Sequence, residues 1–443
     1  MMPETVAASR YVSEFVGTYL LVVTVGCNVL SGSAVWAALS AGCVLMVAVY
    51  ALSASSGAHF NPAVSLAMGL VGKLPWDEVC IYAVVQTLAG GLGAGTYLVM
   101  FEKSFTLRPG DGYSIWHAGA VEGLYTFMLC FVYLNSVCKR HTDRDQLFGL
   151  AIGAVIVAGG YAAGHISGGC FNPALAFGID VTSGKLFLSI VYAACQLLGG
   201  GLASTLYLVV RPDDFTSRPI DSYPLASTLT SEFVGTFLVV LTAGLAALGR
   251  SPAAALAVAA AVVSMVFALS SCSGAHFNPA VTLSVLASAR ARCNPTKGMW
   301  YILVQLLAAI TAAFACSALE HGRTFALGPG RGFGWGSAGV AEILFTFLVC
   351  FAYLTIFTTV VGNYQVLSLV VGACVAAAGF AVGSVSGALL NPALAAGISI
   401  AHVVHGGALS GLVLYTGAHL TGASTAALAF MATHPSEYSK LPM

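Results

Sequence analysis

Charged residues are scarce in this sequence. Only 8% of its 443 residues are Asp, Glu, Lys or Arg, whereas 58% are hydrophobic and the mean hydropathy is +0.89. A soluble domain carries about 25% charged residues. Long apolar runs with charges confined to short gaps are instead typical of helices that span a bilayer. Acidic and basic residues balance at 17 each, so no basic surface for nucleic acid is expected.

The residue patterns of enzymes and metal sites are also lacking. The 12 cysteines form no Cys-x-x-Cys pair and no Cys/His spacing typical of a metal site. Many of them, such as Cys27, Cys130 and Cys350, fall inside apolar runs, where free cysteine behaves as a small buried hydrophobic residue. The sequence has no Ser/His/Asp grouping and no glycine-rich nucleotide-binding loop in a strand-to-helix context. We therefore expect no cofactor, no metal and no enzyme activity.

What is present is a fourfold repeat. The string SGAHFNPAV at residues 56–64 recurs unchanged at 273–281, and the looser versions SGGCFNPAL and SGALLNPAL occupy 167–175 and 386–394. Each quarter opens with a glutamate in an apolar run and later places a tyrosine four residues before a glutamine, or before His419 in the last quarter. Such order indicates two long units, each containing two short ones. We predict a first module at 1–212, a linker at 213–224 and a second module at 225–443.

Apolar runs and helix breakers predict six membrane spans in each module. The stretches headed by Asn-Pro-Ala are too short to cross a bilayer, and we interpret them as re-entrant half-helices. The predicted fold class is an all-α membrane protein of two tandem six-helix bundles, with twelve transmembrane helices in total and two half-helices per bundle. The spans are expected near 11–30, 34–53, 78–100, 117–138, 147–164 and 185–210, and near 225–248, 252–271, 298–319, 336–360, 365–383 and 404–430.

The Asn-Pro-Ala triplets have a clear physical role in a membrane. Proline suits the first turn of a helix and asparagine is a good N-cap, so each triplet predicts a helix start. A helix that starts at mid-depth in a bilayer implies a cavity or pore beside it. The twelve motif residues are Asn61, Pro62, Ala63, Asn172, Pro173, Ala174, Asn278, Pro279, Ala280, Asn391, Pro392 and Ala393.

The two half-helices of one module are expected to point at each other. Three spans separate them, which inverts the second repeat, so they would enter from opposite faces and meet N-terminus to N-terminus. Each helix N-terminus carries roughly half a positive charge, and two of them make a local barrier to cations and protons. The asparagine amides would then donate hydrogen bonds to a passing oxygen atom.

Several further polar residues in the apolar runs need an explanation. Carboxylates inside a span are costly and often functional, so the four repeated glutamates could relay protons. Their repetition favours the alternative, in which each accepts hydrogen bonds from N–H groups of a re-entrant loop. Two histidines that precede the asparagines could gate the passage or act as fixed loop donors. These loop residues are Glu14, Glu122, Glu232, Glu342, His59 and His276. Close helix contacts are expected at Gly17, Gly90, Gly91, Gly199 and Gly200.

These motifs resemble the aquaporin and aquaglyceroporin family, also called major intrinsic proteins. The family's AEFxGT-like opening, its SGAHxNPAV loop and its second Asn-Pro-Ala are all present, twice, over nearly the whole chain. The family usually assembles as tetramers with one pore per subunit. The resemblance therefore implies a homo-oligomer in which two copies of this chain could form a four-pore pseudo-tetramer.

The sequence departs from the family at the outer constriction. The second motif usually reads NPAR, and leucine replaces that arginine here in both modules. Small side chains and a lost arginine imply a wide, apolar constriction that admits larger neutral solutes. Because Val258 and Ala388 are bulkier than Ala41 and Gly169, the second pore is predicted to be the narrower one. By the family's spacing the constrictions are Ala41, Gly160, Gly169 and Leu175, and Val258, Gly379, Ala388 and Leu394.

The sequence thus predicts a passive transmembrane channel for water or small uncharged solutes of the glycerol, urea and ammonia class. Two alternatives stay open: an ion- or proton-coupled secondary transporter, and a non-conducting structural membrane protein. The expected partners are small neutral permeants and the lipid bilayer, without nucleic acid. Lysine and arginine are divided eleven to six between the two sides, which favours a multi-pass protein with both termini cytoplasmic.

Overall fold

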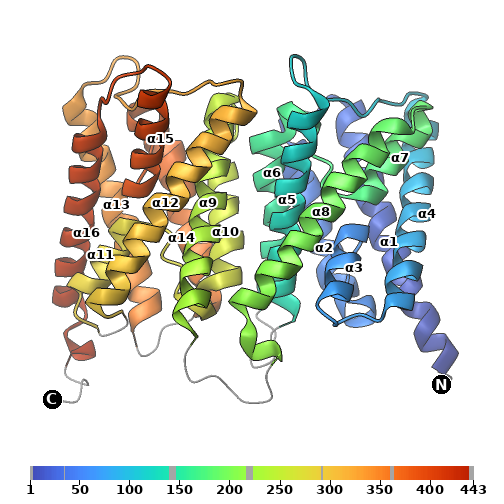
Figure 1. Ribbon diagram of the computed structural model, residues 1–443, viewed down its shortest axis with the longest axis horizontal. Helices are drawn as coiled ribbons and strands as arrows, with labels where there is room; N and C mark the ends of the chain where they lie inside the picture. Colours follow the sequence, from blue (N-terminus) through green and yellow to red (C-terminus); the bar gives the residue numbers. More distant parts are fainter. Residues whose placement is uncertain are drawn as a thin grey trace. The chain divides into compact units, whose positions relative to one another are not determined.

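A computed structural model describes residues 3–33, 35–138, 146–215, 223–290, 293–359 and 364–438. The chain forms two compact units, Met1–Pro219 and Ile220–Met443 (Figure 1). Within the predicted linker, residues 216–222 lie outside the described residues.

The described residues contain sixteen α-helices, two short 3₁₀ helices and no strand, which confirms the predicted all-α class. The first unit comprises α1 (Pro3–Leu30), α2 (Ala37–Ser56), α3 (Pro62–Leu70), α4 (Trp76–Phe101), α5 (Ile115–Val137), α6 (Phe148–Ser167), α7 (Pro173–Ser183), α8 (Phe187–Val210) and η1 (Pro212–Phe215). The second comprises α9 (Leu225–Leu248), α10 (Ala254–Ser273), α11 (Pro279–Ala287), α12 (Pro295–Leu319), α13 (Trp335–Thr358), α14 (Tyr364–Ser386), α15 (Pro392–Val404), α16 (Leu412–Thr433) and η2 (Pro435–Glu437).

Twelve of these helices correspond to the predicted spans. In the described part of the chain, eleven helices are both long and apolar enough to cross a membrane. The twelfth, α16, has 22 residues and is long enough, but it is not among the eleven. Its sequence contains His419 and several threonines, including Thr421 and Thr425, which lower its hydropathy.

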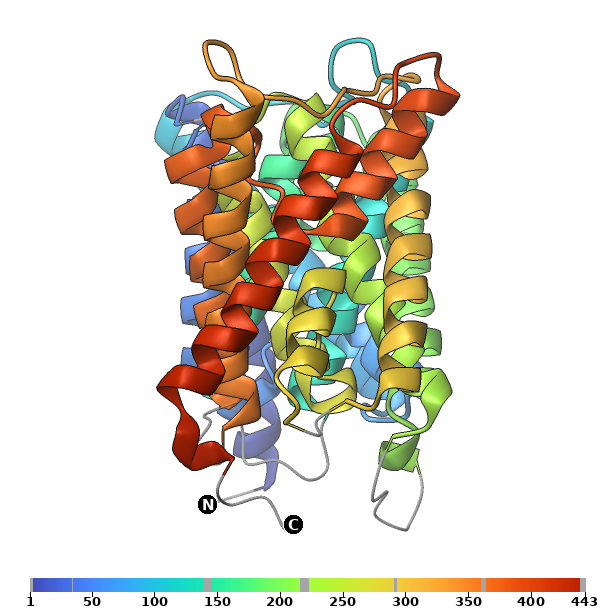
Figure 2. The same ribbon diagram turned by 90° about the vertical axis from the view of Figure 1, so that its left-hand side faces the viewer.

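The four remaining helices are the predicted half-helices α3, α7, α11 and α15. They have 9, 11, 9 and 13 residues. At 1.5 Å per residue they are about 14–20 Å long and cannot cross a hydrocarbon core of about 30 Å. Within each unit the two half-helices lie toward opposite ends of the bundle, as Figure 1 shows for α3 and α7 and Figure 2 for α11 and α15. We call the face where the first helix of a unit begins its start face, and the opposite face its far face.

Glycines allow the half-helices to approach the full-length helices. A Cβ atom added to Gly90 on α4 would lie 2.3 Å from the carbonyl oxygen of Ala174 on α7. One added to Gly200 on α8 would lie 2.8 Å from the Ala63 carbonyl oxygen on α3. These distances are below van der Waals contact, so the backbones touch where only glycine fits. The prediction of a close contact at Gly91 is wrong, because its nearest atom would be a Phe177 ring carbon at 3.8 Å.

Candidate functional site: two passages between paired half-helices

The asparagines hold the two half-helices of each unit tip to tip. Asn61 Oδ1 accepts a hydrogen bond from the Ala63 N–H at 2.9 Å and so caps α3. Its Nδ2 donates to the carbonyl oxygen of Phe171, in the opposite loop, at 2.8 Å. Asn172 Nδ2 in turn donates a hydrogen bond to the Phe60 carbonyl oxygen at 2.8 Å. The two helix starts therefore lie next to each other at the centre of the unit.

The second unit repeats this arrangement. Asn278 Nδ2 donates to the Leu390 carbonyl oxygen at 2.8 Å, and Asn391 Nδ2 donates to the Phe277 carbonyl oxygen at 3.0 Å. Each asparagine uses one of its two amide hydrogens in this way. That these amides also donate to a passing oxygen atom stays a prediction.

The loops that precede the asparagines have a strained backbone. The residue before each asparagine lies in the left-handed region, with φ of 51° at Phe60, 50° at Phe171, 51° at Phe277 and 53° at Leu390. Such a conformation costs a residue other than glycine about 1–3 kcal/mol and persists only where the surroundings enforce it. It lets each loop turn back at mid-depth and present its polar backbone to the centre of the unit.

Each loop is held by a buried glutamate. Glu14 accepts hydrogen bonds from the His59 N–H at 2.9 Å and the Phe60 N–H at 2.7 Å. It also accepts from Ser56 Oγ at 2.7 Å and Gln86 Nε2 at 2.8 Å, and its side chain is fully buried. The same four kinds of donor surround Glu122, Glu232 and Glu342, with His419 in place of glutamine at the last. Four hydrogen bonds compensate the burial of each carboxyl group.

The glutamines and His419 are functional partners that the sequence reasoning did not assign. Gln86, Gln196 and Gln305 each donate Nε2 to the glutamate of their quarter at 2.8, 2.8 and 2.9 Å. His419 Nε2 donates to Glu342 Oε2 at 2.7 Å, with both side chains fully buried. The signal was present, because each of these residues follows a tyrosine by four positions in every quarter.

The two loop histidines have fixed positions. His59 Nδ1 is hydrogen-bonded to Ser65 Oγ at 3.0 Å, and its ring packs edge-on against Tyr82 and Tyr133. His276 Nδ1 is likewise hydrogen-bonded to Thr282 Oγ1, and its ring packs edge-on against Tyr301 and Tyr353. Both rings line the passage of their unit. The roles of these histidines as loop donors or gates stay predictions.

A passage runs beside the helix starts in each unit, and the two differ greatly in size. In the first unit the cavity has a volume of about 30 Å³ and lies between Ala41, Gly169 and Leu175 and the His59–Tyr133 pair. In the second unit it has a volume of about 550 Å³ and lies between Val258, Ala388 and Leu394 and the His276–Tyr353 pair. The prediction that the second pore is narrower at its constriction stays a prediction.

Seven of the eight predicted constriction residues line one of the two cavities. Val258, Gly379, Ala388 and Leu394 all line the second cavity, and Ala41, Gly169 and Leu175 line the first. Gly160 is not among the residues that line the first cavity, and a Cβ atom there would lie 2.6 Å from Ala38 Cβ on α2. Their role in selectivity stays a prediction.

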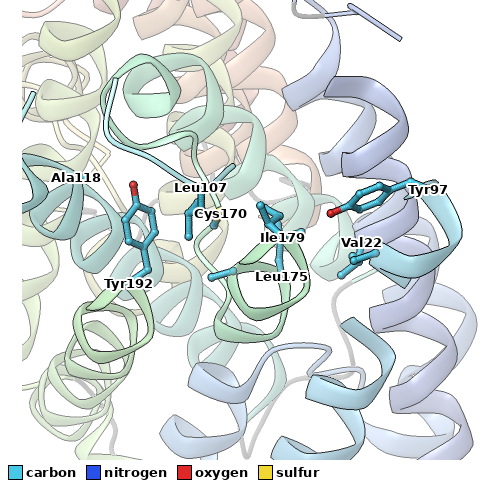
Figure 3. Close-up of a cluster of buried hydrophobic side chains, with 10 residues drawn as sticks. Val22, Tyr97, Leu107, Ala118, Cys170, Leu175, Ile179 and Tyr192 are labelled. Atoms are coloured by element: carbon cyan, nitrogen blue, oxygen red, sulfur yellow. The ribbon is translucent and has the colours of Figure 1, made fainter. Parts of the chain in front are cut away.

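Leu175 occupies an apolar setting rather than a vacant arginine site. It is buried in a cluster with Leu107, Cys170 and Ile179 (Figure 3). The two tyrosine hydroxyl groups of this cluster already have hydrogen-bond partners, since Tyr97 is hydrogen-bonded to Thr182 and Tyr192 to the Ser167 carbonyl oxygen. An arginine at position 175 would therefore be buried without a partner among these residues. No group of three or more His, Cys, Asp or Glu that could hold a metal ion occurs among the described residues.

Paired half-helices that meet beside a passage, in two units of inverted repeats, define a membrane channel. The sequence profile described as Major intrinsic protein matches residues 2–207, 148–249 and 219–430. The chain belongs to this family, and it contains the family's module in tandem. Members of the family are channels rather than enzymes, so the chain is an integral multi-pass membrane protein that forms a passive channel for water or small solutes.

Individual relatives align with about one half of the chain. Aquaporin NIP1-1 of Zea mays is 32% identical over 227 residues, which cover 48% of this chain and 77% of the relative. Aquaporin NIP1-1 of Oryza sativa subsp. japonica is 34% identical over 222 residues, which cover 48% and 76%. The solved structure of the aquaglyceroporin from Plasmodium falciparum aligns with 47% of this chain and 98% of its own, at 19% identity and a TM-score of 0.39.

Proposed function

We propose that this protein conducts small uncharged solutes of the glycerol, urea and ammonia class, together with water, through apolar constrictions that lack an arginine. The observation that carries the proposal is the cavity of about 550 Å³ in the second unit. It runs from Val258 and Gly379 near the far face, past Asn278 and Asn391, to His276. A passage of this volume has room for solutes larger than water.

The electrostatics favour neutral permeants. Two helix N-termini meet at Asn278 and Asn391, and their partial positive charges oppose the entry of cations and protons. No charged side chain is among the residues that line either cavity in the described part of the chain. A charged solute would therefore lose its hydration without compensation.

The hydrogen bonds of the glutamates favour a channel over a proton-coupled transporter. Glu14 and Glu232 each accept four hydrogen bonds and are fully buried away from the cavities. A proton relay needs a carboxylate that faces a path for the proton, whereas the oxygens of these two carboxylates are occupied by donors of their own loop and helices.

The test is solute flux into vesicles that contain the purified full-length chain. We expect vesicles in an inward gradient of glycerol or urea to reswell faster than empty vesicles, with a rate that is linear in concentration and independent of a pH gradient. Permeability equal to that of empty vesicles would refute the proposal. Saturable uptake that requires a pH gradient would instead support a coupled transporter.

For the orientation we propose that both termini are cytoplasmic, since the Lys and Arg distribution places the start faces inside. Single cysteines introduced at Asp77 and at Asp111, in a background that lacks the exposed native cysteines Cys43 and Cys80, would test this. A membrane-impermeant thiol reagent added to intact cells should label position 111 and leave position 77 unlabelled. The reverse pattern would contradict the proposed orientation.

A further inference from the structure

The two passages differ in a set of four apolar positions at mid-depth. In the first unit these are Leu21, Leu45, Leu129 and Ile156, and in the second Val239, Val262, Val349 and Val375. We call these sets the leucine ring and the valine ring. They are counterparts because each pair stands at the same distance from a repeated motif: Leu45 precedes Asn61 by as many residues as Val262 precedes Asn278.

The internal repeat relates the four positions of each ring to one another. Leu21 and Leu129 follow Glu14 and Glu122 at the same spacing, and Leu45 and Ile156 precede Asn61 and Asn172 at the same spacing. The four side chains therefore come from two positions of the short repeat, each used twice. A change at all four acts on the passage from several sides.

Each position of the valine ring carries one carbon fewer than its counterpart. Two further lining positions follow the same trend, because Ile152 corresponds to Val371 and Val25 to Ala243. A stretch of passage that is too narrow for a water molecule contributes almost nothing to the volume of the cavity. Removal of one carbon from several sides therefore widens the passage and contributes to the difference between about 30 and about 550 Å³. The larger cavity also takes in far-face residues such as Pro252, Phe380 and Ser384, whose counterparts do not line the smaller one.

The features at the centre of the two passages are alike. The asparagine contacts are the same in both units, and the His59–Tyr133 and His276–Tyr353 pairs have ring centroids 5.4 and 5.5 Å apart. The far-face constriction acts in the opposite sense, since Val258 and Ala388 are larger than Ala41 and Gly169. The rings thus change in the direction of the larger second cavity.

The leucine ring also disfavours water. A cavity needs about 10–15 Å³ to hold one water molecule, so about 30 Å³ holds two or three at most. Around them the ring presents only hydrocarbon, and a hydrophobic constriction of this kind closes a pore by expelling water. The second cavity has room for a continuous file of molecules.

From these observations we infer that the two pores of this chain are not equivalent: solutes of glycerol size and larger pass only through the second unit, and the leucine and valine rings set this size limit. The inference rests on the proposed function, because it assigns the solute flux of the whole chain to one of its two passages. It names specificity-determining residues at mid-depth rather than at the far-face constriction.

A matched pair of substitutions in the full-length chain tests the inference. Val375→Phe fills the valine ring, and Ile156→Phe makes the corresponding change in the leucine ring. In vesicles with inward gradients of urea, glycerol and xylitol, we expect Val375→Phe to reduce the glycerol and xylitol permeabilities at least tenfold toward those of empty vesicles. Ile156→Phe should leave both within about twofold of the unsubstituted chain.

A gain of function provides a second test that misfolding cannot imitate. The variant Leu21→Val/Leu45→Val/Leu129→Val/Ile156→Val converts the leucine ring into a valine ring. We expect its glycerol permeability to approach twice that of the unsubstituted chain. When Val375→Phe is added to this variant, about half of the doubled permeability should remain, because the first unit still conducts.

The outcomes separate the inference from the proposed function. Equal losses in Val375→Phe and Ile156→Phe, or no gain in the fourfold valine variant, would overturn the inference and leave the channel function standing. If the unsubstituted chain shows no permeability above that of empty vesicles, the proposed function fails and the inference fails with it.

Discussion

At the scale of single residues, the four buried glutamates are the clearest determinants of the site. Glu14 receives N–H groups from His59 and Phe60, and Phe60 is one of the residues with left-handed backbone. The carboxylate thus stabilises the conformation that brings the loop to mid-depth. Its effect on solute passage is indirect, through the position of the loop.

Glu14→Gln should destabilise the protein by about 2 kcal/mol or more. An amide can accept at only one oxygen, so one loop N–H would face another donor in a buried site. Glu78→Gln is the control, because Glu78 pairs with the partly exposed Arg10 at 3.1 Å, a contact worth at most about 1 kcal/mol. Thermal unfolding of the purified protein in detergent would compare the two. Equal shifts in midpoint would contradict the proposed loop-support role.

His419 offers a second test at this scale. Its Nε2 donates to Glu342, but its Nδ1 is buried and has no hydrogen-bond partner among the described residues. His419→Gln restores the residue found in the other three quarters, and we expect it to change stability by less than about 1 kcal/mol. His419→Leu removes the donor and should cost about 1–3 kcal/mol. If the leucine variant were as stable as the glutamine variant, the hydrogen bond would be unimportant.

At the scale of elements, the packing of half-helices against full-length helices depends on individual glycines. Gly90 and Gly91 are neighbours on α4, yet only Gly90 faces the backbone of α7. This difference could not be foreseen from two adjacent glycines in an apolar run. It depends on the crossing of two helices whose sequences lie far apart.

Gly90→Ala should destabilise the protein by about 2 kcal/mol or more, since the added methyl group would meet the Ala174 carbonyl oxygen and force α4 and α7 apart. Gly91→Ala should be neutral, or stabilising by up to about 1 kcal/mol, because alanine favours the helix. The readout is the midpoint of thermal unfolding for both variants. A larger loss in Gly91→Ala would show that the contact is wrongly placed.

At the scale of the whole molecule, two units in one chain suggest how the protein assembles. The family resemblance implies four pores per assembly, which two copies of this chain would supply. We expect native mass spectrometry of the detergent-purified protein to show a species of twice the 45.3 kDa chain mass. A purely monomeric spectrum in several mild detergents would contradict this, as would a predominant tetramer.

The sequence predicted the helices and half-helices well, because helix starts such as Asn61–Pro62 are encoded by neighbouring residues. It could not predict the hydrogen bond from Asn61 to Phe171, which depends on how distant loops fold together. Nor could it predict the different volumes of the two cavities, which depend on side chains that come together around a passage only in the fold. Leu45 and Val262 are both ordinary apolar residues of a membrane span. Their difference of one carbon atom becomes important only because both side chains line a passage.

The joining of both passages in one polypeptide also bears on how a cell could control them. Two separate genes would allow their products to be made in different amounts, and a membrane could be tuned from one permeability to another. Here every ribosome that completes the leucine-lined unit goes on to make the valine-lined one. The ratio of the two pores is one to one by synthesis, so a cell can change the balance of flux only by acting on a pore after translation.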